Sequence, residues 1–189
     1  GIIERRFAAA DESVVDLAVA AGGSAIAKSG IDPALIDMVM VATVTHPYQT
    51  PSAAAEVADR LGLVDTAATD LSAACAGFCY GLGLADGLVR AGNARYVLVV
   101  GVEKLTDWVD PTDRSSAFIF ADGAGAVIVG PSDVPALGPV VWGSDGSQEG
   151  VIWQTADWHS AVETGEFPKL GMDGRLVFKW ATSFIAQAT

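Results

Sequence analysis

Cysteine, basic side chains and long hydrophobic runs are all scarce in this sequence of 189 residues. The two cysteines, Cys75 and Cys79, are too few for a disulfide framework, and without a histidine nearby they do not suggest a metal site. No apolar run approaches the ~18 residues that a membrane-spanning helix requires. Eleven Lys and Arg residues against 23 Asp and Glu residues give a formal net charge of −12, which is unsuited to nucleic acid or an anionic membrane. We therefore expect neither as a partner.

The composition is otherwise that of a folded protein. Hydrophobic residues make up 51% and charged residues 18%, and the mean hydropathy is +0.38, which excludes intrinsic disorder. Apolar runs at residues 96–102 and 124–129 have the length of strands that are buried on both faces. The sequence starts at Gly1 rather than at Met and stops at Thr189 inside a predicted helix, so we expect a piece of a longer protein.

Hydrophobic periodicity and breaker residues divide the chain into alternating elements. Helices are predicted at 13–29, 51–61 and 73–91, strands at 36–43, 66–71 and 95–102, and a hairpin of strands 116–121 and 124–130 across Asp122-Gly123. The alternation predicts βαβ units and a mixed, mainly parallel sheet. Residues 131–171 are predicted to be loops with short strands, and a helical pattern resumes at 173–188.

The segment DLSAACAGF at residues 70–78 has the clearest chemical potential. A strand ends there, the chain turns through small residues, and a helix begins with Cys75 near its first turn. The N–H groups and partial positive charge of a helix N-terminus favour a thiolate, and catalytic sites commonly lie at this edge of a parallel sheet. A buried, inert Cys75 is the alternative that these residues leave open, and Cys79 is expected to belong to the core.

The longer run DLSAACAGFCYGL resembles the active-site segment of the type III β-ketoacyl-[acyl carrier protein] (ACP) synthases, which are thiolase-fold enzymes. Further matches follow in the family's order and spacing: GIIERRFAAA (1–10), THPYQTPS (45–52), YVLVVGVEK (96–104), DPTDR (110–114), FIFADGAGA (118–126) and GRLVFKW (174–180). ERRFAA, THPYQTP and VGVEKL are most similar to the actinobacterial branch. The resemblance implies an α/β, thiolase-like fold: an N-terminal βαβαβαββ half at 1–168 that carries Cys75, and the first helix of a C-terminal half at 169–189.

The resemblance also implies a reaction. Cys75 matches the family's nucleophile, which takes an acyl group from a primer acyl-CoA and passes it to the carbanion formed when malonyl-ACP loses CO₂. The family starts fatty acid synthesis in the cytoplasm as a homodimer, without a cofactor. We expect the edge strand near 95–102 and the pocket loop at the dimer interface. The family's assisting His and Asn are expected beyond Thr189, and His46 and His159 match neither and are predicted to be loop residues.

Binding residues follow from the same resemblance. Arg114 matches the arginine that packs on the CoA adenine, and Thr50 matches the residue that caps the acyl pocket of the partner subunit. A residue as small as Thr50 indicates a longer or branched primer. Leu105 and Phe120 match pocket walls, Met172 and Phe178 match positions near the pantetheine channel, and Lys179, with Arg175 nearby, matches a position facing ACP.

Several alternatives stay open at this stage. Arg114 could instead pair with Asp110 or Asp113, the wall and channel residues could be ordinary core, and Lys179 could be a solvated surface residue. The DGAGA glycines at 122–126 do not fit G-x-G-x-x-G and are attributed to tight strand packing. The rival functions are a thiolase-fold acyltransferase of secondary metabolism and a non-catalytic half that shapes a partner's pocket. A half of a two-lobed core is also expected to leave an apolar face in water and to aggregate.

Overall fold

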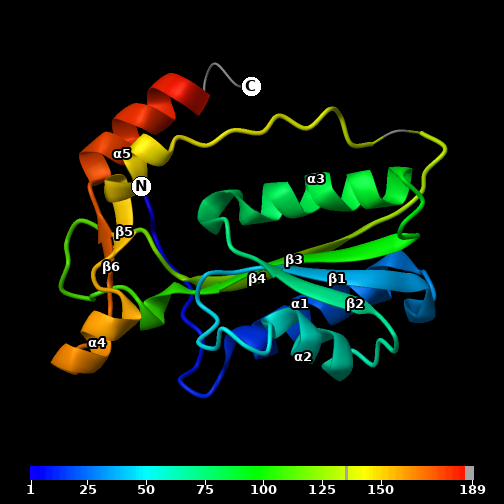
Figure 1. The fold of residues 1–189 in the computed structure, drawn as a ribbon, viewed down its shortest axis with the longest axis horizontal. Coiled ribbons are helices and arrows are strands. Elements are labelled where there is room, and N and C mark those ends of the chain that lie inside the picture. Colours follow the sequence, from blue (N-terminus) through cyan, green and yellow to red (C-terminus); the bar gives the residue numbers. More distant parts are fainter. Residues whose placement is uncertain (135, 186–189) are drawn as a thin grey trace. The chain divides into compact units, whose positions relative to one another are not determined.

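A computed structural model describes residues 1–134 and 136–185 of the chain (Figure 1). The chain forms two compact units. The sheet unit consists of Arg6–Lys104 and Asp122–Trp142, and the pocket unit consists of Gly1–Arg5, Leu105–Ala121 and Gly143–Thr189.

The sheet unit is built on a four-stranded sheet in the order β2-β1-β3-β4. Its strands are β1 (Ile36–Ala42), β2 (Ala67–Leu71), β3 (Tyr96–Lys104) and β4 (Asp122–Val129). β1 pairs in parallel with both β2 and β3, while β4 runs antiparallel to β3. The predicted mixed, mostly parallel sheet is confirmed.

The predicted hairpin is wrong. Residues 114–119 form turns rather than a strand, and Asp122 opens β4, opposite Lys104 at the end of β3. β4 pairs with β3 instead. The pairing covers the whole length of β4, whereas the predicted strand 116–121 would pair with only part of it. In the described residues before Val14, no strand precedes the first helix, so the leading strand of the expected βαβαβαββ order is not seen.

Helices cover both faces of this sheet (Figure 1). α1 (Val14–Ser29) and α2 (Ala53–Arg60) lie on one face, and α3 (Gly77–Arg90) lies on the other. α1 starts after Ser13, whose hydroxyl accepts the Asp16 N–H at 3.1 Å while the Asp16 carboxylate accepts the Ser13 N–H at 2.7 Å. This capping box starts the helix, and Gly30 in the left-handed conformation ends it. Both ends lie close to the bounds that the sequence predicts.

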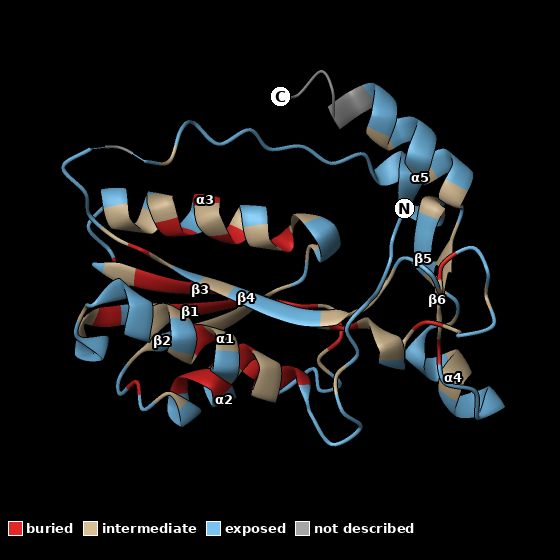
Figure 2. Ribbon diagram, turned by 180° about the vertical axis from the view of Figure 1, so that it is seen from behind, coloured by how far each residue is buried: buried red, intermediate tan, exposed pale blue. Residues whose placement is uncertain are grey.

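The core is centred on β3 (Figure 2). Its residues Val97, Leu98, Val99 and Val100 are fully buried, alternately facing α3 and the α1–α2 layer. The predicted two-sided burial of 96–102 is thus confirmed for its central part, but the expectation that this strand forms the sheet edge is wrong. β4 is an edge strand in the described sheet, and for that reason Val127 is 38% exposed rather than buried as predicted.

Two glycines let α3 approach the sheet closely. A Cβ atom on Gly81 would lie 2.8 Å from Val99 Cγ1, and one on Gly77 would lie 3.0 Å from Ala42 Cβ. The start of α3 is therefore held against the end of β1. Gly123 and Gly125 have no described atom within 4 Å of a Cβ position, so tight packing does not account for them.

The pocket unit contains short elements. These are a 3₁₀ helix (Gly146–Val151), β5 (Ile152–Gln154), α4 (Trp158–Thr164), β6 (Leu170–Met172), α5 (Gly174–Trp180) and a π-helical turn (Ala181–Ile185). β5 and β6 pair antiparallel. α4, capped by Asp157, was not predicted, and it makes His159 an exposed helical residue rather than a loop residue. The predicted helix 173–188 begins as expected, and its residues 186–188 lie outside the described residues.

Candidate active site

Cys75 lies at the carboxyl end of the parallel strands, in a short 3₁₀ turn (Ala74–Ala76) between β2 and α3. Cys75 therefore comes just before α3 rather than in its first turn. It is exposed, so the alternative of a buried, inert Cys75 is wrong. Cys79 is also exposed, so its assignment to the core is wrong as well, because it lies on the side of α3 away from the sheet-facing glycines. Ala74 has φ 44°, a left-handed conformation that costs a residue with a Cβ about 1–3 kcal/mol.

The segment before Cys75 is joined to α2. The Asp70 carboxylate, near the end of β2, accepts the N–H groups of Ala53 and Ala54 at 2.8 Å each. These are the first N–H groups of α2, and a carboxylate is well suited to them because it complements the helix dipole. Ser52 completes the cap by accepting the Ala55 N–H at 3.3 Å.

A second carboxylate, that of Glu103 in β3, holds the end of β1. It accepts the Val44 N–H at 3.0 Å, the Thr45 N–H at 3.1 Å, and the hydroxyls of Thr43 and Thr45 at 3.2 and 2.5 Å. Burial raises the pKa of Glu103 despite these hydrogen bonds, which act in the opposite direction. Lys104, the next residue, turns to the other side and donates from Nζ to the Glu12 carbonyl at 2.7 Å.

The loop between these two anchors, residues 43–52, contains two residues singled out in the sequence. Thr50 is exposed. His46 is half-buried as a loop residue, and its ring meets that of Tyr48 edge-on at 5.7 Å between centroids. His46 Nδ1 is buried and has no hydrogen-bond partner within the described part of the chain.

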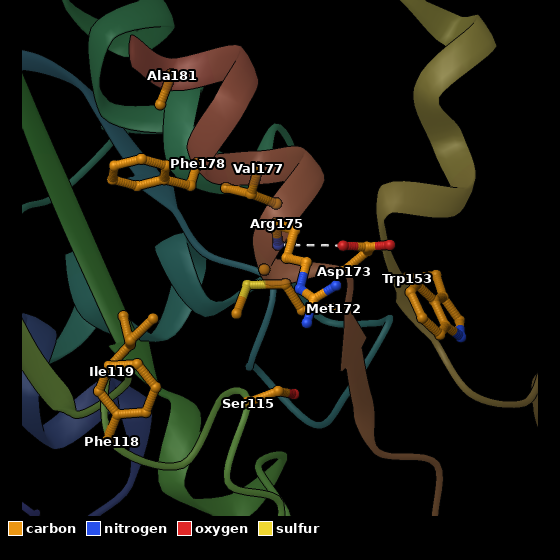
Figure 3. A pocket seen from close by; sticks show the side chains of 11 residues that line it. Ser115, Phe118, Ile119, Trp153, Met172, Asp173, Arg175, Val177, Phe178 and Ala181 are labelled. Carbon is orange, nitrogen blue, oxygen red and sulfur yellow. Dashed lines mark hydrogen bonds between the residues drawn. The ribbon is translucent and has the colours of Figure 1, made fainter.

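The pocket unit contains a hollow of about 1120 Å³ (Figure 3). Met172 and Phe178, which the resemblance assigned to a channel, both line it. α5 supplies Val177 and Phe178, while Phe118 and Ile119 come from the turns before β4 (Figure 3). The Asp173 carboxylate caps α5 by accepting the Arg175 and Leu176 N–H groups at 3.1 Å. The lining is predominantly apolar, which suits an uncharged group rather than an anion.

Arg114 lies on a loop shaped by two aspartates. Asp113 accepts the Ser116 hydroxyl at 2.6 Å and the Ser115 N–H at 2.8 Å, and these bonds hold the pKa of Asp113 below its usual value. Asp110 likewise accepts the Thr112 hydroxyl at 2.7 Å and its N–H at 2.8 Å, which lower the pKa of Asp110. Both carboxylates thus accept hydrogen bonds from their own loop, and Arg114 between them is exposed.

Three further predicted residues have distinct positions in the pocket unit, and none of them lines the hollow. Leu105 is half-buried at the start of a 3₁₀ turn (Leu105–Asp107). Phe120 is half-buried, and its carbonyl accepts a hydrogen bond from Arg5 Nη1 at 2.8 Å. Lys179 is exposed in the last turn of α5.

Comparison with known proteins gives a consistent answer. Residues 69–146, which include Cys75 and Arg114, match the family model for 3-oxoacyl-[acyl-carrier-protein] synthase III. The chain is 49% identical to β-ketoacyl-[acyl-carrier-protein] synthase III of Streptomyces glaucescens over 189 residues, covering 99% of this chain and 57% of that protein.

The chain is similar in sequence to the β-ketoacyl-ACP synthase III proteins.

Other synthase III relatives agree. The mycobacterial β-ketoacyl-ACP synthase III of Mycobacterium avium is 51% identical over 183 residues, which are 96% of this chain and 55% of that protein. The crystal structure of the priming β-ketosynthase of the R1128 polyketide biosynthetic pathway superposes with a TM-score of 0.94 at 46% identity, covering 97% of this chain and 56% of that one. The expected thiolase-like fold and actinobacterial affinity are confirmed, and the chain spans somewhat more than half the length of these relatives.

Sequence reasoning missed several residues of the hollow and of the loop anchors. Ile119, Trp153 and Val177 line the hollow, but each looks like ordinary core in the sequence. Asp70 and Glu103 stand near the ends of two strand patterns. A carboxylate at the end of a strand was the sequence signal that could have identified them. In the ranges that the structure describes, no group of three or more His, Cys, Asp or Glu side chains could hold a metal ion, and no helix is long and apolar enough to cross a membrane.

Proposed function

We propose that this chain carries the acylation site of a β-ketoacyl-ACP synthase III. The enzyme condenses an acyl-CoA primer with malonyl-ACP and so starts fatty acid synthesis. The observation that carries the proposal is the exposed Cys75 in a strained turn at the carboxyl edge of the sheet, within the segment that matches the synthase III model.

Two steps follow from a cysteine nucleophile. The Cys75 thiolate attacks the thioester carbonyl of the acyl-CoA, a bond from Sγ to the acyl carbon forms, and CoA leaves as its thiolate. Malonyl-ACP then loses CO₂, the electron pair of the broken bond becomes a carbanion, and this carbanion displaces the Cys75 thiolate from the acyl group. The products are β-ketoacyl-ACP and CO₂. We assign neither His46 nor His159 to the decarboxylation.

The substrate-binding roles are part of the proposal. We assign Arg114 to the CoA adenine, and its engaged aspartate neighbours support this role. Met172 and Phe178 are assigned to the pantetheine arm, which the apolar hollow would suit. Thr50, Leu105 and Phe120 are assigned to the acyl pocket, where a threonine leaves room for a longer or branched primer.

The proposed partners are acyl-CoA, ACP and a second copy of the chain. Lys179, exposed on α5, is assigned to the acidic carrier protein, since charge attraction speeds such encounters. The described edges of the sheet are β2 and β4, and we propose that one of them takes part in the homodimer. The reaction is placed in the cytoplasm with its substrates, and it requires no cofactor.

A second candidate function has one specific observation behind it. The solved structure with a TM-score of 0.94 is described as a priming ketosynthase of a polyketide pathway. The same acylation of Cys75 would then prime a secondary metabolite rather than a fatty acid. The two functions share the first step and differ in the carrier protein that accepts the product.

Mass spectrometry of the intact chain tests the shared step. After incubation with acetyl-CoA or isobutyryl-CoA, we expect the chain to gain one acyl group at Cys75. Cys79→Ser is the matched control because both thiols are exposed; it should be acylated, whereas Cys75→Ser should not. Acylation of Cys79 instead, or none while iodoacetamide alkylates Cys75, would overturn the proposal.

A further inference from the structure

The loop that carries Thr50 is held at both ends by carboxylates from neighbouring strands. At its start, Glu103 of β3 accepts the N–H groups of Val44 and Thr45. At its end, Asp70 of β2 accepts the N–H groups of Ala53 and Ala54. β2 and β3 lie on either side of β1, from which the loop emerges, so each neighbour of β1 supplies one anchor.

One of these anchors belongs to the segment of the nucleophile. Asp70 stands in the run DLSAAC that ends at Cys75. The following residue, Leu71, accepts the Thr43 N–H with its carbonyl at 3.3 Å, and a Cβ on Gly77 would lie 3.0 Å from Ala42 Cβ. The start of the loop, the end of β2 and the start of α3 are thus in continuous contact, and a shift of Asp70 would move the loop relative to Cys75.

We infer that Asp70 and Glu103 are a pair of positioning residues that fix the backbone of the 43–52 loop, and with it Thr50, and thereby set which acyl chain lengths the pocket capped by Thr50 accepts. The part about chain length rests on the proposed function; the positioning itself does not. Both residues act through the backbone of the loop rather than on the reacting atoms.

The chemistry of the anchors explains why carboxylates are used. Hydrogen bonds to a charged acceptor are shorter and stronger than those between neutral groups. At each anchor the two N–H groups are nearest to different oxygens of the carboxylate, and an amide offers only one oxygen. Asp70→Asn and Glu103→Gln therefore keep the shape but lose part of each anchor.

Hydrogen–deuterium exchange of the full 189-residue chain tests the positioning. We expect amides of residues 44–54 to exchange on the order of tenfold faster in Asp70→Asn and in Glu103→Gln. Thr43→Val, a milder change that removes one hydroxyl donor to Glu103, should accelerate exchange mainly at Val44 and Thr45. Asp59→Asn, an exposed change on α2, is the control and should leave the loop unaffected. Unchanged exchange in folded Asp70→Asn and Glu103→Gln would overturn the inference.

The effect on selectivity is measured by competition among thioesters. Rates of Cys75 acylation by acetyl-, isobutyryl- and octanoyl-CoA are compared in each variant, with iodoacetamide as a probe of the thiol alone. We expect the ratio of rates between short and long chains to change several-fold while alkylation by iodoacetamide changes little. A faster-exchanging loop with an unchanged ratio would overturn the role in selectivity. If the unmodified chain is not acylated at all, the proposed function fails and the exchange experiment still decides the positioning.

Discussion

Ala74 and Glu103 illustrate how single residues prepare the site around Cys75. Ala74 holds a left-handed backbone with φ 44°, and its neighbour Cys75 is exposed as a result of this tight turn. Glu103 is partly buried and binds four donors of the 43–45 segment through one carboxylate. Such constrained groups persist only where the surrounding structure holds them, which is typical of functional sites.

The ionisation of Glu103 predicts a pH-dependent stability. Because burial raises its pKa in the folded chain above the ordinary value of 4.5, folding favours the protonated acid. Its contribution to the free energy of unfolding is complete below pH 4.5 and is lost as the pH rises through the raised pKa. Glu103→Gln removes this titration, so the free energy of unfolding of the variant should lack this pH dependence.

Urea unfolding of both proteins across this pH range checks the sign. The free energy of unfolding of the wild-type chain, minus that of Glu103→Gln, should fall as the pH rises through the raised pKa of Glu103. A rise of this difference with increasing pH would contradict the raised pKa. Glu56→Gln, at an exposed position on α2, serves as the comparison for carboxylate loss without burial.

At the scale of the element, α3 depends on the absence of side chains where it meets the sheet. Gly81 faces the fully buried Val99, whose branched side chain cannot move aside easily. Gly87, on the same helix, is exposed and has no described atom within 4 Å of a Cβ position. Packing therefore requires a glycine at position 81 but not at position 87.

These two glycines predict opposite effects of alanine. Gly81→Ala should destabilise the chain, because overpacking costs about 1–3 kcal/mol and the gain in helix propensity recovers only part of it. Gly87→Ala should stabilise it by about 0.5–1 kcal/mol, since only the helix propensity changes. Thermal and urea unfolding of both variants measure this, and equal effects at the two positions would contradict the close approach of α3.

At the scale of the whole molecule, large apolar side chains remain exposed in both units. Ile3 is 99% exposed, Phe178 is 71% exposed and Val64 is 83% exposed. A chain with so much apolar surface in water lowers its free energy by covering it. The formal net charge of −12 opposes association of the chains, because like-charged chains repel one another. Salt weakens this repulsion.

Self-association is therefore expected. Light scattering should give a mass above the 19.4 kDa of one chain, rising with protein concentration and with salt. Ile3→Ser should reduce the rise of mass with protein concentration. Ser29→Ala, which adds little apolar area at an exposed position, should leave this rise unchanged. A single species of 19.4 kDa at every concentration would contradict the expectation.

How far the sequence predicts this protein depends on whether a feature is local. The helix from Val14 to Ser29 is predicted well because its capping box and Gly30 lie within the segment itself. The Cys75 turn is predicted because small residues separate a strand from a helix. The 168/169 domain boundary and the roles of the binding residues stay predictions. Three predictions are wrong: the hairpin, the edge position of 95–102 and the burial of Cys79. Each depends on neighbours that are distant in the chain.

The amino-acid sequence by itself determined the class of fold, the alternation of helices and strands, and the turn that carries Cys75, because periodicity, caps and breakers act over a few residues. Only the tertiary structure decided that β4 pairs with β3, that the 105–121 segment leaves the sheet unit between them, and that Asp70 and Glu103 hold one loop from two strands. The hydrogen bonds of Asp70 and Glu103 to the loop join residues that are 16 to 59 positions apart in the sequence. No local preference encodes which of many distant partners gives the lowest free energy.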